Sequence, residues 1–305
     1  MAKDKLEILF EDRWIIVVSK PAGMLSVGYP GFRGKTVQDV LEDMRRGLGK
    51  VRVEAVHRLD RETSGVMMFA LGSEVRDRIM NDWHEIVSER TYRCACEHRS
   101  TCRGGKVLPD SGTIDAPLAY NKAHVAFVPR PDDEKALKEA ERAVTHFKVI
   151  KRGELFDLVE CELETGRKNQ IRAHMKHLGH PIAGDDIYGS VAVERGSASG
   201  APNDAAGRLA LHARILAFTH PYTGEFKRFE TPEPSLFAAL ADKKRQYRPE
   251  EPAETLAPFS KGRKKSESGF RDRAKENGEA VQPRRKTGAN GSKYIPAPGS
   301  KPHSS

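Results

Sequence analysis

The side chain best placed to do chemistry in this sequence is that of Asp60, within the stretch HRLDRETSG that runs from His57 to Gly65. The apolar run from Val66 to Leu71 predicts a buried strand, so Asp60 belongs to the loop that leads into it, where protein scaffolds often carry reactive groups. A carboxylate in such a loop can serve as a nucleophile or as a general base. An isolated acid before a strand is more often a turn residue, so a catalytic role for Asp60 depends on the motifs around it.

Two predicted helices bracket this loop. Upstream, residues 6–18 predict a hairpin around a Glu-Asp turn, and KPAG at residues 20–23 predicts a loop. Thr36 is expected to cap a helix that ends at Gly49, and Ser73 is expected to cap a second helix. The apolar side of the second helix carries Val75, Ile79, Met80, Trp83 and Ile86.

Further strands and a helix are predicted downstream. ERTYRCACE, residues 89–97, has the period-two pattern of a half-buried strand and places Tyr92 on the face of two cysteines. Residues 97–141 are rich in charge, Gly and Pro, so loops are expected there. LVECELETG predicts a strand, NQIRAHMKHLG a helix, and RLALHARILAF and EFKRFETP a closing pair of strands around the turn HPYTG.

Composition limits the classes of protein to consider. The chain has 305 residues and 38% hydrophobic residues, which is enough for a sizeable core. No apolar run approaches the roughly 18 residues of a membrane span, and the N-terminus lacks the pattern of a signal or transit peptide, so we expect a cytoplasmic protein without membrane contact. The four cysteines form no CxxC pair, which favours reduced thiols and no zinc site.

The positive charge is concentrated at the C-terminus. The net charge is +9, and residues 255–305 contain twelve Lys or Arg against four Asp or Glu. This segment is also rich in Gly, Pro and Ser and poor in apolar residues, so residues 251–305 are predicted to be a disordered basic tail and residues 1–250 a single catalytic domain. The tail could attract phosphate groups or serve only for solubility.

Several motifs together resemble those of the RluA-type RNA pseudouridine synthases. They are HRLDRETSG, ERTYRC, LETGRKNQIRAHMKHLGHPIAGDDIYG and RLALHARILAFTHPYTGE, with weaker matches in KPAGMLSV and SGTIDAPL. The resemblance runs from about Leu6 to Pro234. It implies an α+β fold, with a long, mixed, mostly antiparallel sheet flanked by helices and split by an active-site cleft. Many such proteins carry an S4-type RNA-binding domain first, but this chain starts its first strand close to Met1, so we expect none.

The resemblance also implies an activity and a site. The enzyme would isomerise specific uridines in ribosomal or transfer RNA to pseudouridine, as a monomer without metal or cofactor. Asp60 matches the essential aspartate, Tyr92 the active-site tyrosine, and Arg172 the arginine that pairs with the aspartate. Arg58 could occupy the gap left when the target nucleotide flips out.

The reaction breaks the bond from ribose C1′ to N1, turns the uracil and joins C5 to the same ribose. Asp60 could attack C1′ as a nucleophile or act as a base at C2′ to give a glycal, and both routes need its carboxylate ionised, which a nearby arginine favours. Tyr92 could stack on the uracil while it turns, and its hydroxyl could assist removal of the C5 proton.

Each assignment has an alternative. Tyr92 could be a core residue, and Arg172 could bridge Glu164 on the surface of its helix. The acids of AGDDIYG suggest a metal site or a second catalytic carboxylate, although a structural turn is the favoured interpretation. Asn169, where a histidine is common in such proteins, is expected to cap the helix that follows.

Two other functions remain open. A glycoside hydrolase would need two carboxylates in matched roles, and only Asp60 has a convincing setting. A non-catalytic RNA-binding module of the same fold is the stronger alternative, although such a module would not need to retain Asp60, Tyr92 and Arg172 together.

Overall fold

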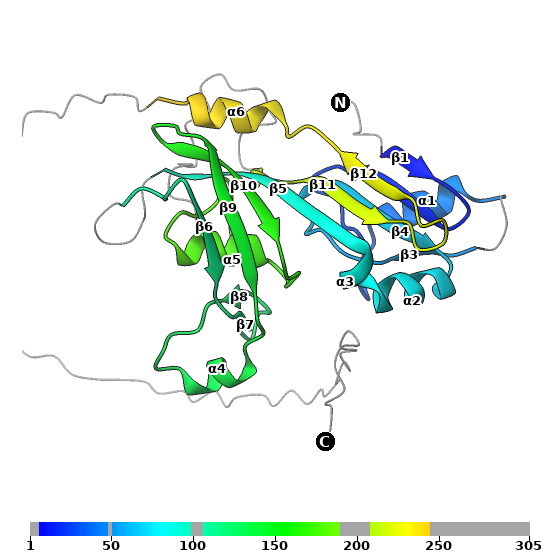
Figure 1. Ribbon diagram of the computed structural model, residues 1–305, viewed down its shortest axis with the longest axis horizontal. Coiled ribbons are helices and arrows are strands. Elements are labelled where there is room, and N and C mark those ends of the chain that lie inside the picture. Colours follow the sequence, from blue (N-terminus) through cyan, green and yellow to red (C-terminus); the bar gives the residue numbers. More distant parts are fainter. Residues whose placement is uncertain (1–5, 48–50, 99–105, 190–207, 245–305) are drawn as a thin grey trace, which may run out of the picture. The chain divides into compact units, whose positions relative to one another are not determined.

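The computed structural model describes residues 6–47, 51–98, 106–189 and 208–244 (Figure 1). The predicted basic tail and the domain boundary at residue 250 lie outside these residues. The strands are β1 (Glu7–Glu11), β2 (Ile15–Lys20), β3 (Val53–Ala55), β4 (Ser64–Leu71), β5 (Val87–Glu97), β6 (Ser111–Asp115), β7 (Ala119–Tyr120), β8 (Ala126–Phe127), β9 (Val144–Lys151), β10 (Phe156–Leu163), β11 (Leu211–Thr219) and β12 (Phe226–Glu230). The helices are α1 (Val37–Met44), α2 (Ser73–Asn81), α3 (Trp83–Ile86), α4 (Glu134–Glu139), α5 (Gln170–His177) and α6 (Ser235–Asp242).

Ten of these strands form one mixed sheet. The order is β1-β2-β4-β11-β5-β10-β9-β6, with β12 beside β11 and β3 beside β4. The pair β11–β4 is parallel, and the other pairs described in this sheet are antiparallel. The predicted α+β class, with a long and mostly antiparallel sheet flanked by helices, is confirmed.

No helix among the described residues is long and apolar enough to cross a membrane.

The first half of the sheet, formed around β2 and β4, is covered on both faces. All eight residues of β4 are buried, which explains its continuous apolar sequence. Ile16 and Val18 point into one core cluster with α1, and Ile15 and Val17 point into another with α2, as the two-residue period of a strand requires. The loop that carries Asp60 therefore leads into a strand that is fixed from both sides.

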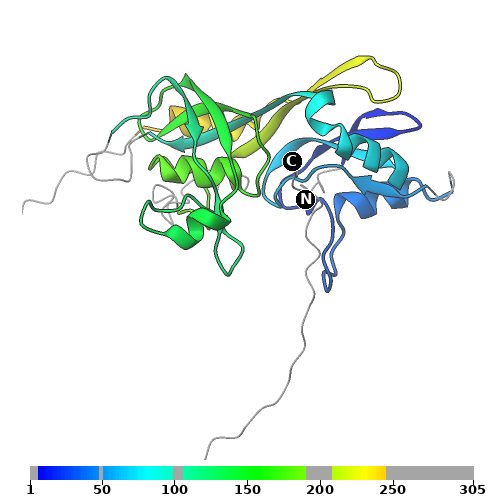
Figure 2. The same cartoon turned by 60° about the horizontal axis from the view of Figure 1, so that its bottom comes forward.

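The second half of the sheet is built on β10, β9 and β6. Its core cluster joins β5 and β10 to Ile171 and Met175 of α5 and to Phe237 and Ala241 of α6. Figure 1 shows α5 and α6 on opposite sides of this part of the sheet. In Figures 1 and 2, β5 and β11 run from this half to the other half, so these two strands hold the halves together.

Some predicted helices and loops need correction. The cap at Thr36 is confirmed and forms a capping box with Asp39, but α1 ends at Met44, and Gly49 lies outside the described residues. Ser73 is not a cap, because Gly72 holds the N-cap position of α2 without a side-chain hydrogen bond. The single helix expected after Ser73 is broken at Asp82 into α2 and α3, and its supposed packing residue Met80 is exposed.

Residues 97–141 also hold more regular structure than expected. The prediction of loops was wrong for β6, the two-stranded sheet of β7 and β8, and helix α4. These elements are short, and α4 has a single buried residue, Ala136, so they lack the repeated apolar pattern from which strands and helices are predicted.

Gly65, the last residue of HRLDRETSG, is required where β4 meets β11. Its φ of +115° is rarely adopted by L-residues, and a Cβ atom there would lie 2.0 Å from the carbonyl oxygen of Ala213. Gly65 and Ala213 are partners in the parallel pair. A side chain at this position would therefore push the two central strands apart just beyond the Asp60 loop.

We predict that Gly65→Ala lowers the free energy of unfolding by on the order of 3 kcal/mol, because it combines backbone strain with a clash against a buried strand. Gly224→Ala is the matched control, since Gly224 also has positive φ, of 70°, but has open space around it. That control should cost only about 1 kcal/mol. Urea unfolding followed by circular dichroism measures both, and equal losses would contradict the role of the close approach.

Candidate active site

The loop of Asp60 is held by its own backbone and by the segment after β2. The Asp60 carbonyl accepts a hydrogen bond from the amide of Thr63 at 3.1 Å, which closes a turn. The Ser26 hydroxyl donates to the carbonyl of Leu59 at 2.8 Å and accepts from the amide of Leu59 at 3.2 Å. Ser26 thus holds both the amide and the carbonyl of Leu59, the residue immediately before Asp60.

Lys20, the first residue of KPAG, connects the two loops. Its ammonium is almost completely buried and donates to the carbonyls of Pro21, Met24 and Arg61 at 3.0, 2.7 and 3.0 Å. Burial lowers the pKa of Lys20 to about 7, against the opposing effect of the negative charges of Glu62 and Asp60. All three N–H groups of the ammonium are used. Lys20 therefore fixes the backbone of Arg61, the residue that follows Asp60.

Arg172 approaches Asp60 from the other half of the sheet. Its Nη1 lies 3.5 Å from Oδ2 of Asp60. Its Nε and Nη2 donate to the two carboxylate oxygens of Asp185 at 2.8 and 2.7 Å, a bidentate pair. Its guanidinium also lies 5.3 Å from the centre of the Tyr188 ring. The predicted pairing of Arg172 with the aspartate is therefore present in the geometry, whereas the alternative bridge to Glu164 is not observed.

The three charged groups differ in exposure. The side chain of Asp185 is fully buried and that of Arg172 is 7% exposed, whereas that of Asp60 is 30% exposed. Burial acts against the charge on Arg172, but the hydrogen bonds and charge of Asp185, together with the charge of Asp60, outweigh it and raise the pKa of Arg172. Arg172 is thus a fixed positive charge, and Asp60 is the member of the group that a substrate can reach.

Tyr92 lies between the core clusters of the two halves. It packs against both of them from β5, so the interpretation of Tyr92 as a packing residue is partly correct. Burial raises the pKa of its hydroxyl to about 12, with a smaller opposing effect from the positive charge of Arg90. The phenolate is therefore scarce at neutral pH, which favours a role for the ring over a role as a base at C5.

Arg58 and His57 have different environments within the same loop. Arg58 is exposed and makes no hydrogen bond or ion pair with any described residue. His57 packs on Trp83 at 5.3 Å between ring centres, and its Nε2 accepts a hydrogen bond from the amide of Met68 at 3.0 Å. Burial, together with the positive charge of Arg90, lowers the pKa of His57 to about 3. His57 is therefore a neutral residue that fixes the loop to β4.

The motif AGDDIYG forms a structural turn. Asp185 accepts hydrogen bonds from the amides of Ile187 and Tyr188 at 3.0 and 2.9 Å while it binds Arg172. Among the residues that the structure describes, no three His, Cys, Asp or Glu side chains are grouped as a metal site. No pattern in the sequence indicates the Asp185–Arg172 pair, because its members are thirteen residues apart and lie outside any shared helix or strand.

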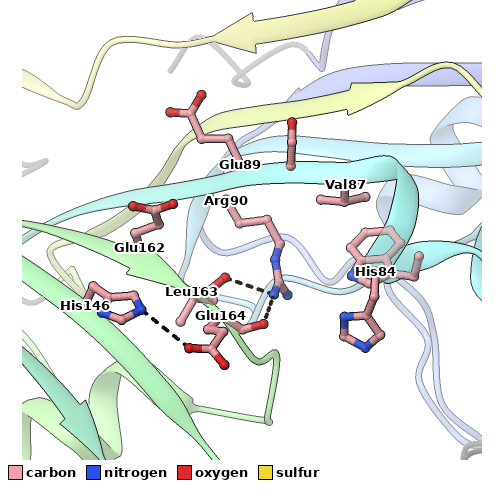
Figure 3. Close-up of a pocket in the computed structure, with 10 residues that line it drawn as sticks. His84, Val87, Glu89, Arg90, His146, Glu162, Leu163 and Glu164 are labelled. Atoms are coloured by element: carbon pink, nitrogen blue, oxygen red, sulfur yellow. Dashed lines mark hydrogen bonds and ion pairs between the residues drawn. The ribbon is translucent and has the colours of Figure 1, made fainter. Parts of the chain in front are cut away.

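A cavity of about 320 Å³ lies near the N-terminal end of β5 (Figure 3). Carboxylates of Glu89, Glu162 and Glu164 line it, together with Arg90, whose Nη2 donates to the carbonyls of Leu163 and Glu164 at 3.0 and 2.8 Å. None of the four predicted site residues lines this cavity. The three carboxylates would repel a phosphate group, so this cavity is an unfavourable site for the RNA backbone.

The comparison with protein families decides the class. A family model described as RNA pseudouridylate synthase matches residues 14–177, more than half of the chain. The chain belongs to the RNA pseudouridylate synthase family. This confirms the resemblance drawn from the motifs and the predicted enzyme class, an isomerase.

Individual relatives agree with this assignment. The tRNA pseudouridine synthase C of Vibrio parahaemolyticus is 35% identical over 238 residues, which cover 74% of this chain and 89% of that protein. The ribosomal large subunit pseudouridine synthase D of Nitrosomonas europaea is 33% identical over 241 residues, which cover 77% of this chain and 64% of that longer protein. The structure of human RNA pseudouridylate synthase domain containing 4 superposes with a TM-score of 0.58 at 25% identity, covering 77% and 91% of the two chains.

We predict that Asp185→Asn destabilises this pseudouridylate synthase domain by about 3 kcal/mol, because it leaves the buried charge of Arg172 without its bidentate partner. Asp186→Asn is the matched control, since Asp186 is 82% exposed and lies 3.8 Å from the same Nη2. That variant should unfold like the wild type in guanidinium titrations. If the two variants are equally stable, Asp185 is not what holds Arg172.

Proposed function

We propose that this chain isomerises uridine to pseudouridine in ribosomal or transfer RNA, with Asp60 acting on the ribose of a flipped-out nucleotide. The observation that carries the proposal is the partly exposed carboxylate of Asp60 at 3.5 Å from the fixed guanidinium of Arg172, in a chain of this family. An uncharged aspartic acid could serve neither as a nucleophile nor as a base. The guanidinium of Arg172 places a fixed positive charge beside this carboxylate.

The proposed reaction assigns a task to each residue. In one route Asp60 attacks ribose C1′ as N1 leaves, and in the other it removes the C2′ proton to give a glycal. In the first route C5 of the turned uracil then displaces the Asp60 carboxylate from C1′. In the second route C5 bonds to C1′ of the glycal while C2′ takes its proton back from Asp60. In both routes the C5 proton is lost and N1 gains one. The ring of Tyr92 would hold the uracil while it turns, since its buried, protonated hydroxyl is a poor base.

The geometry supports this function over the two alternatives. A glycoside hydrolase needs a second working carboxylate, but Asp185 is fully buried and committed to Arg172. A module that only bound RNA would gain nothing from an exposed acid, which repels phosphate groups. The names of the two relatives support ribosomal and transfer RNA as substrate classes. Mapping pseudouridines in cells with and without the gene would identify the target.

Release of tritium from RNA labelled at uracil C5 tests the proposal. We predict that Asp60→Asn lowers the rate of release by at least about 10³-fold, because an amide of the same size is neither a nucleophile nor a base. RNA affinity should change by no more than a few-fold, since the substitution removes one negative charge and little surface. No release by the wild-type protein from total ribosomal and transfer RNA would favour the RNA-binding module instead.

A second prediction concerns Arg58. Because Arg58 is exposed and makes no hydrogen bond or ion pair with the described residues, its side chain can enter the space that a flipped nucleotide vacates. Arg58→Ala should therefore reduce tritium release about 10-fold or more from a structured RNA and much less from a short single strand, in which no stacked space must be filled. Equal losses on both substrates would refute this role.

A further inference from the structure

We infer that Asn169 is a positioning residue, which orients the carboxylate of Asp60 through its side-chain amide. The inference rests on the proposed function, because it concerns how the reacting acid is held. Asn169 directly precedes α5, the helix that carries Arg172. The expectation that Asn169 caps this helix was wrong, since its side chain makes no capping hydrogen bond.

The side chain of Asn169 points to Asp60 instead. With its nitrogen toward the acid, the carboxamide lies 3.0 Å from Oδ2 and 3.1 Å from Oδ1. The opposite assignment would set a carbonyl oxygen against two carboxylate oxygens, which repel it, so the hydrogen-bond partners identify the group facing Asp60 as the NH₂. One N–H of that NH₂ can then point between the two carboxylate oxygens and be shared by them.

The other side of the carboxamide is also held. The Tyr188 hydroxyl lies within hydrogen-bond reach of both the Asn169 side chain and the carbonyl of Ala126, 2.9 Å from the latter, and its single hydrogen serves one of these two acceptors at a time. Tyr188 is part of the turn whose Asp185 binds Arg172. One turn therefore supports both side chains that reach Asp60, Arg172 through a carboxylate and Asn169 through a hydroxyl.

Arg172 and Asn169 make different contributions to the acid. Arg172 supplies a full charge, but its nearest atom lies 3.5 Å from a single oxygen, which is long for a hydrogen bond. Asn169 supplies two shorter contacts, one to each oxygen, without a charge. The two contacts of Asn169 restrict rotation of the carboxylate plane, so this residue determines which oxygen lone pairs face the ribose.

The backbone explains why few residue types fit this position. Asn169 has φ 57° and ψ 21°, the left-handed conformation that Gly, Asn and Asp adopt most readily. Gly fits the backbone but has no donor, and Asp fits it but places a second negative charge beside Asp60. Of these three residue types, only Asn combines the left-handed conformation with a hydrogen-bond donor for the acid. Substitution by Gly or by Asp therefore removes the donor and keeps a residue type that fits the backbone.

The experiment compares Asn169→Gly and Asn169→Asp with the wild-type protein in the tritium-release assay across pH. Asn169→Gly should lower kcat about 10- to 100-fold with KM within a few-fold, and it should move the acidic limb of the pH–rate profile to higher pH, because a donor that favours the charged acid is lost. Asn169→Asp should lose more activity than Asn169→Gly. His124→Gly, at a left-handed residue (φ 55°) outside the site, should behave like the wild type.

Carbon-13 NMR of the Asp60 carboxyl gives a readout that does not require activity. The midpoint of its titration should rise in Asn169→Gly relative to the wild type. An unchanged midpoint together with an unchanged kcat would overturn the inference. If the wild-type protein releases no tritium, the proposed function fails, yet the titration still decides whether Asn169 holds the acid: a raised midpoint supports the contact, and an unchanged one overturns it.

Discussion

The contact between Asp60 and Arg172 joins two halves of one sheet. It can form only because the backbone on each side is held in place. On one side, the buried ammonium of Lys20 and the hydroxyl of Ser26 fix the residues on either side of Asp60. On the other side, Asp185 fixes Arg172 through two hydrogen bonds. These two attachments explain why a loop residue can be placed accurately.

The distribution of contacts around Arg172 also matters for reactivity. A carboxylate that is bound tightly by a guanidinium is stabilised as an anion and is a weak nucleophile or base. Here the short, bidentate contact goes to the buried Asp185, and Asp60 receives the longer one. The arginine therefore places a positive charge beside Asp60 without a short contact to the oxygens that must react, and the neutral amide of Asn169 can orient them.

The sequence predicted features that depend on local pattern or on a complete motif. The predictions included the buried strand β4, the helix cap at Thr36 and the pairing of Asp60 with Arg172. The missed features depend on contacts between distant segments. Asp185 was assigned only to a turn, because nothing near it in the sequence reveals that a buried guanidinium lies beside it. Asn169 was assigned to a helix cap, because its left-handed backbone cannot be seen in the sequence. That backbone turns the side chain away from the helix.

The place of β11 has a consequence for synthesis of the protein. This strand, which comes late in the chain, lies between β4 and β5, and it bonds to both. A nascent chain that has not yet reached residue 219 therefore has two unpaired strand edges in the middle of the sheet, and no strand pairing joins β4 to β5. The strand pairing that joins the part of the sheet carrying Asp60 to the part packed on the helix of Arg172 is therefore completed only when nearly all of the described chain has been synthesised.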